Sequence, residues 1–243
     1  MGYKPYYIYV LFKRYAQDII NIQNGAIING ISNYMKNKKL GIMGLNDGTL
    51  LEKMYNELAL RKGVKVIGDI KMPLAIPAVD IIETKEYIFT NCAPRDNLDD
   101  NYITEASIGK AVRASSSYPA MFCPCEFKNH MFLDGGTLDN VPVKALKRMC
   151  DKKIMAVNFE ADKVEEESDI MDIIMKTLDI MGNKIAEKAL EESDFVLTVP
   201  TNRIGLFDIH KLDKCYNFRV WSGNERYRQN KRDLQRINIK NII

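Results

Sequence analysis

The chain has 243 residues, of which 46% are hydrophobic and 28% are charged, and its formal net charge at pH 7 is +3. This composition is typical of a globular protein with a sizeable core, and so small a charge does not indicate nucleic-acid binding. The longest apolar run near the start, residues 6–12, is too short to cross a bilayer. Five cysteines are an odd number in a chain too long to need disulfides. We therefore expect reduced thiols and a cytoplasmic protein.

Helices are predicted for the first part of the chain. Bulky apolar residues on more than one face predict a well-buried helix over residues 4–20, and a second helix is expected over 25–37. Asn46 or Asp47 can cap a third helix, which runs to Lys62 with apolar residues at helical spacing.

Two strands are predicted next, at residues 71–82 and 87–90, on either side of a short turn. Proline lacks a backbone N–H and is unfavourable inside a central strand. Pro73 and Pro77 therefore indicate that the first strand begins irregularly or lies near an edge of its sheet.

Helices and strands alternate in the rest of the chain. Thr104 and Ser107 mark the start of a helix that runs to Ala114. The later elements are strands at 121–127 and 131–134, a helix at 143–149, a strand at 153–159, a helix at 168–191 and a strand at 195–199. This alternation predicts an α/β fold with a mainly parallel central sheet flanked by helices.

The most informative segment is the turn Asp134-Gly135-Gly136. An apolar strand leads directly into it, and residues 140–142 (Asn-Val-Pro) then open a helix. The sequence therefore places a carboxylate at the carboxyl end of a strand, where open α/β sheets bind their ligands. Aspartate and glycine are also common turn residues for steric reasons alone, so the tripeptide by itself is more simply a tight turn.

A second segment changes that interpretation. Residues 112–122 read VRASSSYPAMF. A helix that ends in Arg-Ala-Ser-Ser-x-x-Pro-x-x-Phe, followed by Asp-Gly-Gly and Asn-x-Pro, resembles the patatin-like phospholipase family in order and spacing. Residues 73–80 resemble the central strand of that family. The resemblance covers residues 1–218 and implies a three-layer α/β domain, which leaves 219–243 as a basic carboxyl-terminal tail.

The resemblance implies a lipid acyl hydrolase with a serine–aspartate dyad and no cofactor. In the family, a serine at a strand-to-helix elbow attacks a lipid ester, and the aspartate of Asp-Gly-Gly, here Asp134, takes its proton. A glycine-rich loop supplies N–H donors to the oxyanion. His130 lies four residues before Asp134 on the same strand, or about 13 Å away in extended chain. We therefore expect His130 to be a loop or strand-start residue and not a catalytic partner.

Two catalytic elements of the family are missing from the 243 residues. Neither a Gly-x-Ser-x-Gly segment nor the glycine-rich oxyanion loop is present. In the family both precede the segment that residues 1–5 resemble, so we expect an amino-terminal truncation that removes the first strands and the nucleophile elbow. Ser115, Ser116 and Ser117 match structural serines of the family, and none lies in a glycine-flanked turn. The chain is therefore expected to be inactive alone.

Alternative functions stay open at this point. A non-catalytic lipid-binding or interaction protein can use the same scaffold, or a separate polypeptide can supply the serine. The expected partners are a lipid or acyl-ester substrate, a membrane surface in peripheral contact, and other copies of the chain through exposed sheet edges. No nucleic-acid partner is expected. The basic tail, residues 219–243, is either a solvated helix or a contact for an anionic lipid.

One group of residues is a candidate for metal binding: Cys123, Cys125, Cys150 and His130. Their spacing matches no common structural zinc pattern. Alternate cysteines on one strand are more simply small buried residues. We therefore expect no metal site.

Overall fold

The computed structural model describes residues 1–21, 36, 43–92, 101–159, 170–199, 208–214 and 216–217. The chain divides into two compact units, Met1–Asp139 and Asn140–Ile243. The helix expected over 25–37, apart from Lys36, and the basic tail at 219–243 lie outside the described residues. The single domain expected over 1–218 stays a prediction.

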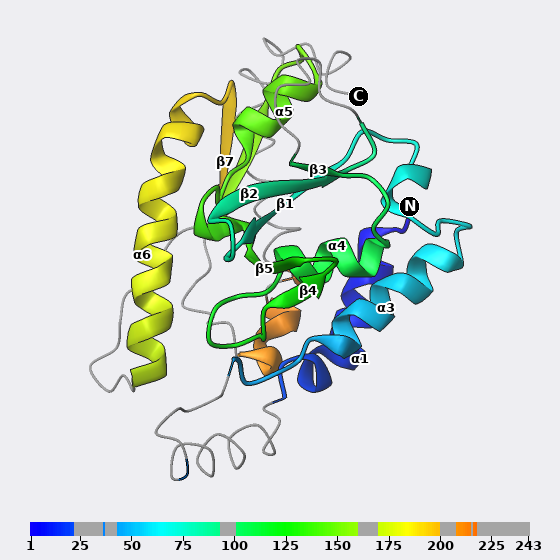
Figure 1. Ribbon diagram of the computed structural model, residues 1–243, viewed down its shortest axis with the longest axis vertical. Coiled ribbons are helices and arrows are strands. Elements are labelled where there is room, and N and C mark those ends of the chain that lie inside the picture. Colours follow the sequence, from blue (N-terminus) through cyan, green and yellow to red (C-terminus); the bar gives the residue numbers. More distant parts are fainter. Residues whose placement is uncertain are drawn as a thin grey trace. The chain divides into compact units, whose positions relative to one another are not determined.

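A five-stranded sheet with the order β3-β2-β1-β5-β4 forms the centre of the first unit (Figure 1). Its strands are β1 (Ala75–Asp80), β2 (Lys85–Thr90), β3 (Tyr102–Ile103), β4 (Cys125–Phe127) and β5 (His130–Asp134). The α/β class is confirmed. Within this sheet, however, β2–β3 is the parallel pair and the other three pairs are antiparallel. The short β1–β2 and β4–β5 connections form hairpins, which require antiparallel strands.

The prolines of β1 do not place it at an edge, because β1 pairs with both β2 and β5. The irregular start that they predict is confirmed, since the strand begins only at Ala75, after Pro73. β5 pairs with β1 from Ala78 to Asp80. Pro77 therefore lies beyond the end of that ladder, where its missing N–H removes no bond to β5.

Three helices stack on the sheet in the order α4 (Ile108–Ser115), α3 (Thr49–Leu60) and α1 (Pro5–Ile19) (Figure 1). α4 packs against β1, β4 and β5, and α3 packs against α4. The predicted cap of α4 is confirmed, since the Ser107 side chain accepts a hydrogen bond from the Lys110 N–H. Gly109 permits the close packing of α4 on α3, because a Cβ there would lie 2.1 Å from the Glu52 carbonyl oxygen.

The start of α3 differs slightly from the prediction. Gly48, with φ of 66°, occupies the capping position. Asn46 and Asp47 still act at this end, because their side chains accept hydrogen bonds from the N–H groups of Gly48 and Thr49. Leu51, Met54 and Leu58 point into the core, as their spacing predicts, but Leu60 is exposed.

The expected burial of α1 is wrong. The helix forms where predicted, but only Ala16 and Ile19 are buried. Tyr6, Ile8 and Val10 are exposed, because α1 packs through one side only, against α3. The apolar residues on two faces of this helix predicted that both faces would be buried. The described residues cover one of these faces.

The core under β5 is aromatic. Phe132 and Phe89 are fully buried, with ring centroids 5.3 Å apart in an edge-on arrangement, and Tyr87 packs on Phe132. Such pairs stabilise beyond the apolar area they bury. This core fixes β5, and with it the strand end that carries Asp134.

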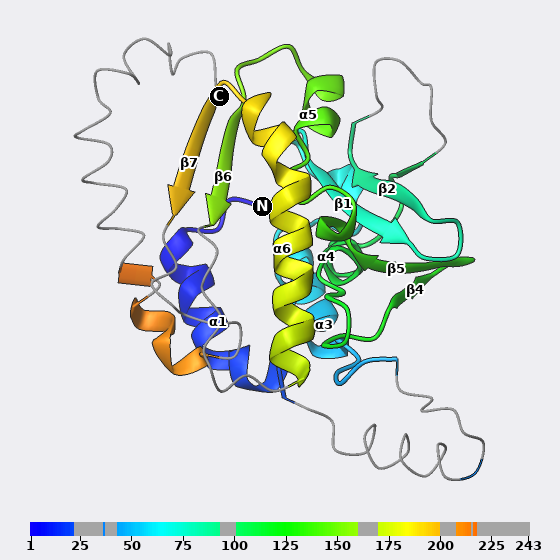
Figure 2. The same cartoon turned by 90° about the vertical axis from the view of Figure 1, so that its left-hand side faces the viewer.

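The second unit contains α5 (Val143–Met149), β6 (Met155–Phe159), α6 (Ile170–Glu191), β7 (Phe195–Val199) and the short η3 (Ile209–Lys211). All four longer elements lie within two residues of their predicted bounds. β6 and β7 run side by side in the same direction (Figure 2), as the alternation of helices and strands predicts. The connection between them contains α6, which gives the chain the length that a parallel crossover needs.

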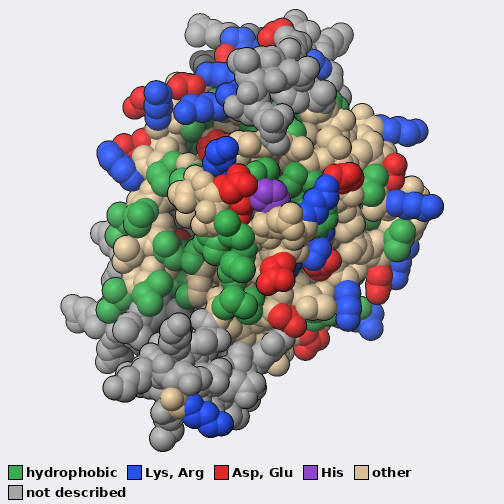
Figure 3. Space-filling model, in the orientation of Figure 1, with side chains coloured by type: hydrophobic (Ala, Val, Ile, Leu, Met, Phe, Trp, Pro, Cys, Tyr) green, Lys and Arg blue, Asp and Glu red, His purple; other side chains and the backbone are tan. Residues whose placement is uncertain are grey.

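Apolar side chains are exposed on α6, and Figure 3 shows apolar side chains gathered over this helix. The exposed members are Ile173, Ile174, Ile180, Met181 and Ile185. Among the described residues, no helix has both the length and the apolar character required to span a membrane.

Candidate active site

Asp134 lies at the last position of β5, as the sequence predicts. It caps the short η2 helix (Gly135–Thr137), and its Oδ1 accepts a hydrogen bond from the Gly136 N–H at 2.8 Å. Its own N–H donates to the Ser117 carbonyl oxygen at 3.1 Å. β1 lies alongside, with Ala78 in register with Asp134. The Gly136 N–H therefore holds one oxygen of the carboxylate, and Ser117 and the pairing with β1 hold the main chain of Asp134.

Gly135 is required for a reason other than backbone freedom. Its φ is not in the left-handed region, unlike that of Gly48. It is buried, and a Cβ at this position would lie 2.5 Å from the Pro77 carbonyl oxygen. Close approach of η2 to β1 thus explains the glycine that follows the aspartate.

Replacement of Gly135 by alanine is expected to destabilise the protein by about 1–3 kcal/mol, because the new methyl group must displace the β1 backbone. Urea denaturation followed by circular dichroism measures the change. Gly68→Ala is the matched control, since its Cβ would lie 3.3 Å from the nearest atom and needs only a small adjustment. Equal stability of the two variants would contradict the close approach at Gly135.

Asp134 has the electrostatic setting of a base. Burial raises the pKa of its carboxyl group, and the hydrogen bond from the Gly136 N–H lowers it by less. Within the described part of the chain, no cation pairs with Asp134. A carboxylate with a raised pKa is a stronger proton acceptor than an exposed one. Oδ1 is held by Gly136, so Oδ2 is the oxygen available for a proton.

The raised pKa of Asp134 predicts that Asp134→Asn stabilises the fold at neutral pH. The folded state binds this proton more tightly than the unfolded state, so the wild-type chain loses stability as the pH rises above the unfolded pKa. Asparagine keeps the acceptor for Gly136 without the partly buried charge. We expect a gain of about 1 kcal/mol at pH 7, which shrinks as the pH falls toward the unfolded pKa. Thermal melts of both proteins from pH 3 to 8 measure it, and a lower Tm for Asp134→Asn at pH 7 would contradict the assignment.

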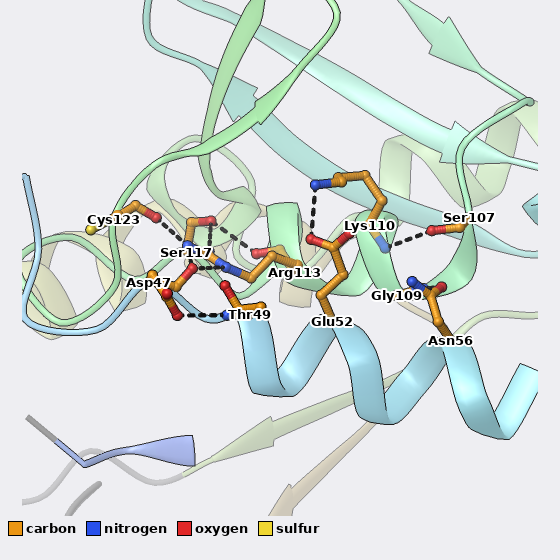
Figure 4. A network of polar contacts seen from close by, with 10 residues as sticks. All are labelled: Asp47, Thr49, Glu52, Asn56, Ser107, Gly109, Lys110, Arg113, Ser117 and Cys123. Carbon is orange, nitrogen blue, oxygen red and sulfur yellow. Dashed lines mark hydrogen bonds and ion pairs between the residues drawn. The ribbon is translucent and has the colours of Figure 1, made fainter. Parts of the chain in front are cut away.

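Arg113 organises the polar contacts beside this strand end (Figure 4). The side chain is only 3% exposed. Its guanidinium donates to the carbonyl oxygens of Asp47 and Cys123 and to the Ser117 hydroxyl. The Ser117 hydroxyl in turn donates to the Arg113 carbonyl oxygen at 2.9 Å. Because the Ser117 carbonyl oxygen holds the Asp134 N–H, Arg113 supports the candidate base through one intermediate residue.

The same arginine fixes the loop before α3. Asn46 forms a parallel bridge with Phe122, which brings residues 44–48 alongside the segment after Ser117. A Cβ on Gly48 would lie 1.9 Å from the Arg113 Nε, and one on Gly44 would lie 2.3 Å from a backbone nitrogen. Both glycines therefore permit close contact, and neither occurs in a recognisable motif that could have predicted it.

The serines near the site have structural roles. Ser117 is completely buried, and its hydroxyl is engaged by Arg113 as both donor and acceptor. Ser115 is the last residue of α4, and Ser116 caps the helix. A nucleophile needs an exposed hydroxyl beside a base, which Ser117 lacks.

His130 begins β5, as expected, and its partner is Asp80. Nδ1 of His130 lies 2.9 Å from Oδ2 of Asp80. Burial by itself raises the pKa of the Asp80 carboxyl group, but hydrogen bonds from His130 and from the N–H groups of Met131 and Ile82 outweigh it, so the pKa is below its ordinary value. Fifty residues separate the pair, so no local motif could reveal it.

The cysteines that the sequence offers as candidate metal ligands do not form one cluster. Cys125 is buried in the core, as expected of a small apolar residue. Within the described residues, the group that brings metal-binding atoms together contains Asp80, Glu83 and His130 and no cysteine.

The first unit is thus an α/β structure that holds a partly buried carboxylate at a strand end, backed by the helix that ends in Arg-Ala-Ser-Ser. The model of the patatin-like phospholipase family matches residues 12–147, more than half of the chain. The chain belongs to the patatin-like phospholipase family.

Two curated relatives extend this comparison. The uncharacterized protein YqhO of Bacillus subtilis (strain 168) is 28% identical over 122 residues, which cover 48% of this chain and 41% of YqhO. Lysophospholipase NTE1 of Lodderomyces elongisporus is 49% identical over 47 residues, which cover 19% of this chain and 3% of that protein. The chain therefore spans less than half the length of either relative.

Proposed function

We propose that the chain is the aspartate-bearing part of a lipid acyl hydrolase, with Asp134 as the base of a serine–aspartate dyad. The observation that carries the proposal is the setting of Asp134: a strand-end carboxylate with one oxygen fixed by Gly136, the other available, and a pKa raised by burial. Membership of the patatin-like phospholipase family supports a lipid ester as the substrate.

The reaction requires a serine from outside the 243 residues, because no Gly-x-Ser-x-Gly segment occurs in them. The serine hydroxyl gives its proton to Oδ2 of Asp134 while its oxygen attacks the acyl carbonyl carbon. Collapse of the tetrahedral intermediate breaks the ester bond, and the proton passes to the leaving alcohol. Water then attacks the acyl-serine, with Asp134 again as the base, and releases the fatty acid.

The substrate class that we propose is the acyl ester of a phospholipid or lysophospholipid. The name of the relative NTE1 gives its substrate as a lysophospholipid. Tyr6 and Val10, one turn apart and both exposed on α1, offer peripheral contact with a lipid surface. Sedimentation with phosphatidylcholine vesicles, with Val10→Glu as the variant, tests this contact.

The proposal is tested by expressing the chain joined to, or together with, a patatin-like segment that carries Gly-x-Ser-x-Gly, which is to be sought in the nucleotide sequence upstream of Met1. Release of fatty acid from lysophosphatidylcholine is expected from the pair and not from the pair with Asp134→Asn. Hydrolysis that survives Asp134→Asn would refute the role of Asp134.

The non-catalytic alternative predicts a different result. A lipid-binding protein on this scaffold would bind a fatty acid or phospholipid with one defined stoichiometry and would gain no hydrolysis from the serine-bearing polypeptide. Fluorescent fatty-acid titration of the chain alone, and again of Asp134→Asn, separates the two functions.

We also propose that the chain self-associates through the β6–β7 sheet. One face of this parallel pair is entirely apolar: Met155, Val157, Phe159, Phe195, Leu197 and Val199. The three β6 members are each nearly half exposed. Among the residues that the structure describes, β6 and β7 form a sheet of two strands, so each has an unpaired edge, and exposed edges with an apolar face favour association.

Val157→Lys is expected to shift the chain from oligomer toward monomer, because it places a charge in the centre of the apolar face. Light scattering after size-exclusion chromatography, over a concentration series, measures the shift. Asn158→Lys, on the opposite face of β6, is the matched control. A wild-type chain that stays monomeric at all concentrations would contradict the proposal.

A further inference from the structure

Three side chains that carry potential metal ligands meet at the opposite end of β5 from Asp134. Asp80 ends β1, Glu83 lies in the turn before β2, and His130 begins β5. Their candidate ligand atoms all lie within 4.8 Å of one another. We propose that Asp80, Glu83 and His130 bind one divalent transition-metal ion, with Zn²⁺ the preferred ion.

Asp80 is held as a ligand is held in known metal sites. Its side chain has no solvent exposure. Oδ1 accepts hydrogen bonds from the N–H groups of Met131 and Ile82, at 3.0 and 3.2 Å. Those bonds leave Oδ2 directed at His130, 2.9 Å away. Hydrogen bonds from surrounding groups commonly orient the carboxylates that bind metals.

The carboxylate of Glu83 is also held by a hydrogen bond. The Tyr87 hydroxyl donates to Oε2 of Glu83 at 2.8 Å. Glu83 is exposed and lies in a hairpin turn, so it can complete coordination with a small movement of its side chain.

His130 is oriented by rings on the side away from solvent. Its ring lies 4.6 Å from that of Tyr87 and 5.5 Å from that of Phe132. The side chain is 22% exposed, which leaves a path for an ion and room for water as a further ligand.

The donor set determines the metal class. One imidazole nitrogen and two carboxylate oxygens form a mixed nitrogen–oxygen set, which favours zinc and neighbouring transition metals over Mg²⁺ and Ca²⁺. An ion at the centre would replace the direct bond between Asp80 and His130 with two metal bonds of about 2.0–2.2 Å. It would join the β1–β2 turn to the start of β5. Of the four candidate ligands in the sequence, this site contains His130 and none of the cysteines. The sequence alone could not show that Asp80 and Glu83 lie beside His130.

The test uses the full chain, freed of metal by EDTA and dialysis, and titrates it with Co²⁺ as the spectroscopic probe. We expect visible absorption that saturates at one Co²⁺ per chain and is abolished by one equivalent of Zn²⁺. Glu83→Gln and His130→Gln are each expected to weaken Co²⁺ binding about tenfold or more. Glu83 is exposed, so Glu83→Gln leaves the fold intact, which circular dichroism verifies.

Two matched controls complete the design. Glu57→Gln changes an exposed glutamate on α3, and His210→Gln changes the other histidine of the chain. Both are expected to bind Co²⁺ as the wild type does. The proposal is overturned if the wild type shows no saturable absorption, or if Glu83→Gln binds Co²⁺ as tightly as Glu57→Gln.

Discussion

Acyl esters incubated with the purified 243-residue chain are expected to hydrolyse no faster than in buffer. In a serine protease, removal of the serine alone lowers turnover by about a million-fold. Here the chain lacks both that serine segment and the glycine-rich oxyanion loop, and its buried Ser117 is bound to Arg113. Release of p-nitrophenol from p-nitrophenyl butyrate measures the rate.

The control for this prediction is Asp134→Asn, which is expected to give the same background rate, because a base without a nucleophile does not catalyse. A wild-type rate well above buffer that falls in Asp134→Asn would show that one of the chain's own serines is the nucleophile. Ser115 and Ser116 would then be changed in turn.

Arg113→Met is expected to destabilise the protein by about 3–5 kcal/mol. The arginine is a buried cation with hydrogen bonds to three different residues, and loss of one partner of such a group leaves the others buried and unsatisfied. Methionine fills part of the volume, so the loss reports mainly on the polar contacts. Urea denaturation measures the change in the free energy of unfolding.

Arg61→Met is the matched control, because Arg61 is largely exposed and its ion pair with Glu57 is long. It is expected to change stability by less than about 1 kcal/mol. If both variants lose the same stability, the contacts of Arg113 do not hold the loop at residues 44–48.

The sequence predicted the local elements well because their signals are local. Ser107 caps α4 within one helical turn, and the apolar run before Asp134 ends at the residue that ends β5. In the five-stranded sheet, the two short hairpins make their strands antiparallel. The alternation of helices and strands along the whole chain predicted parallel strands instead, and so hid this feature. The sequence also could not show that one side of α1 would stay exposed.

The candidate site was predictable where a motif marks it. Asp134 and its glycines stand in one short segment that matches the family, and the structure places them as expected at the end of β5. The contacts of Arg113 with Asp47, and of His130 with Asp80, join residues at least fifty positions apart. Such pairs arise from how the strands and helices pack, and a single sequence carries no signal for them.

Fluorophosphonate labelling with peptide mass mapping tests the central claim most directly. It is applied to the chain alone and to the chain expressed with the polypeptide that carries Gly-x-Ser-x-Gly. The account predicts no adduct on the chain alone, and in the pair an adduct on the added serine that disappears with Asp134→Asn. An adduct on Ser115, Ser116 or Ser117, or labelling of the pair that is unchanged by Asp134→Asn, would contradict it.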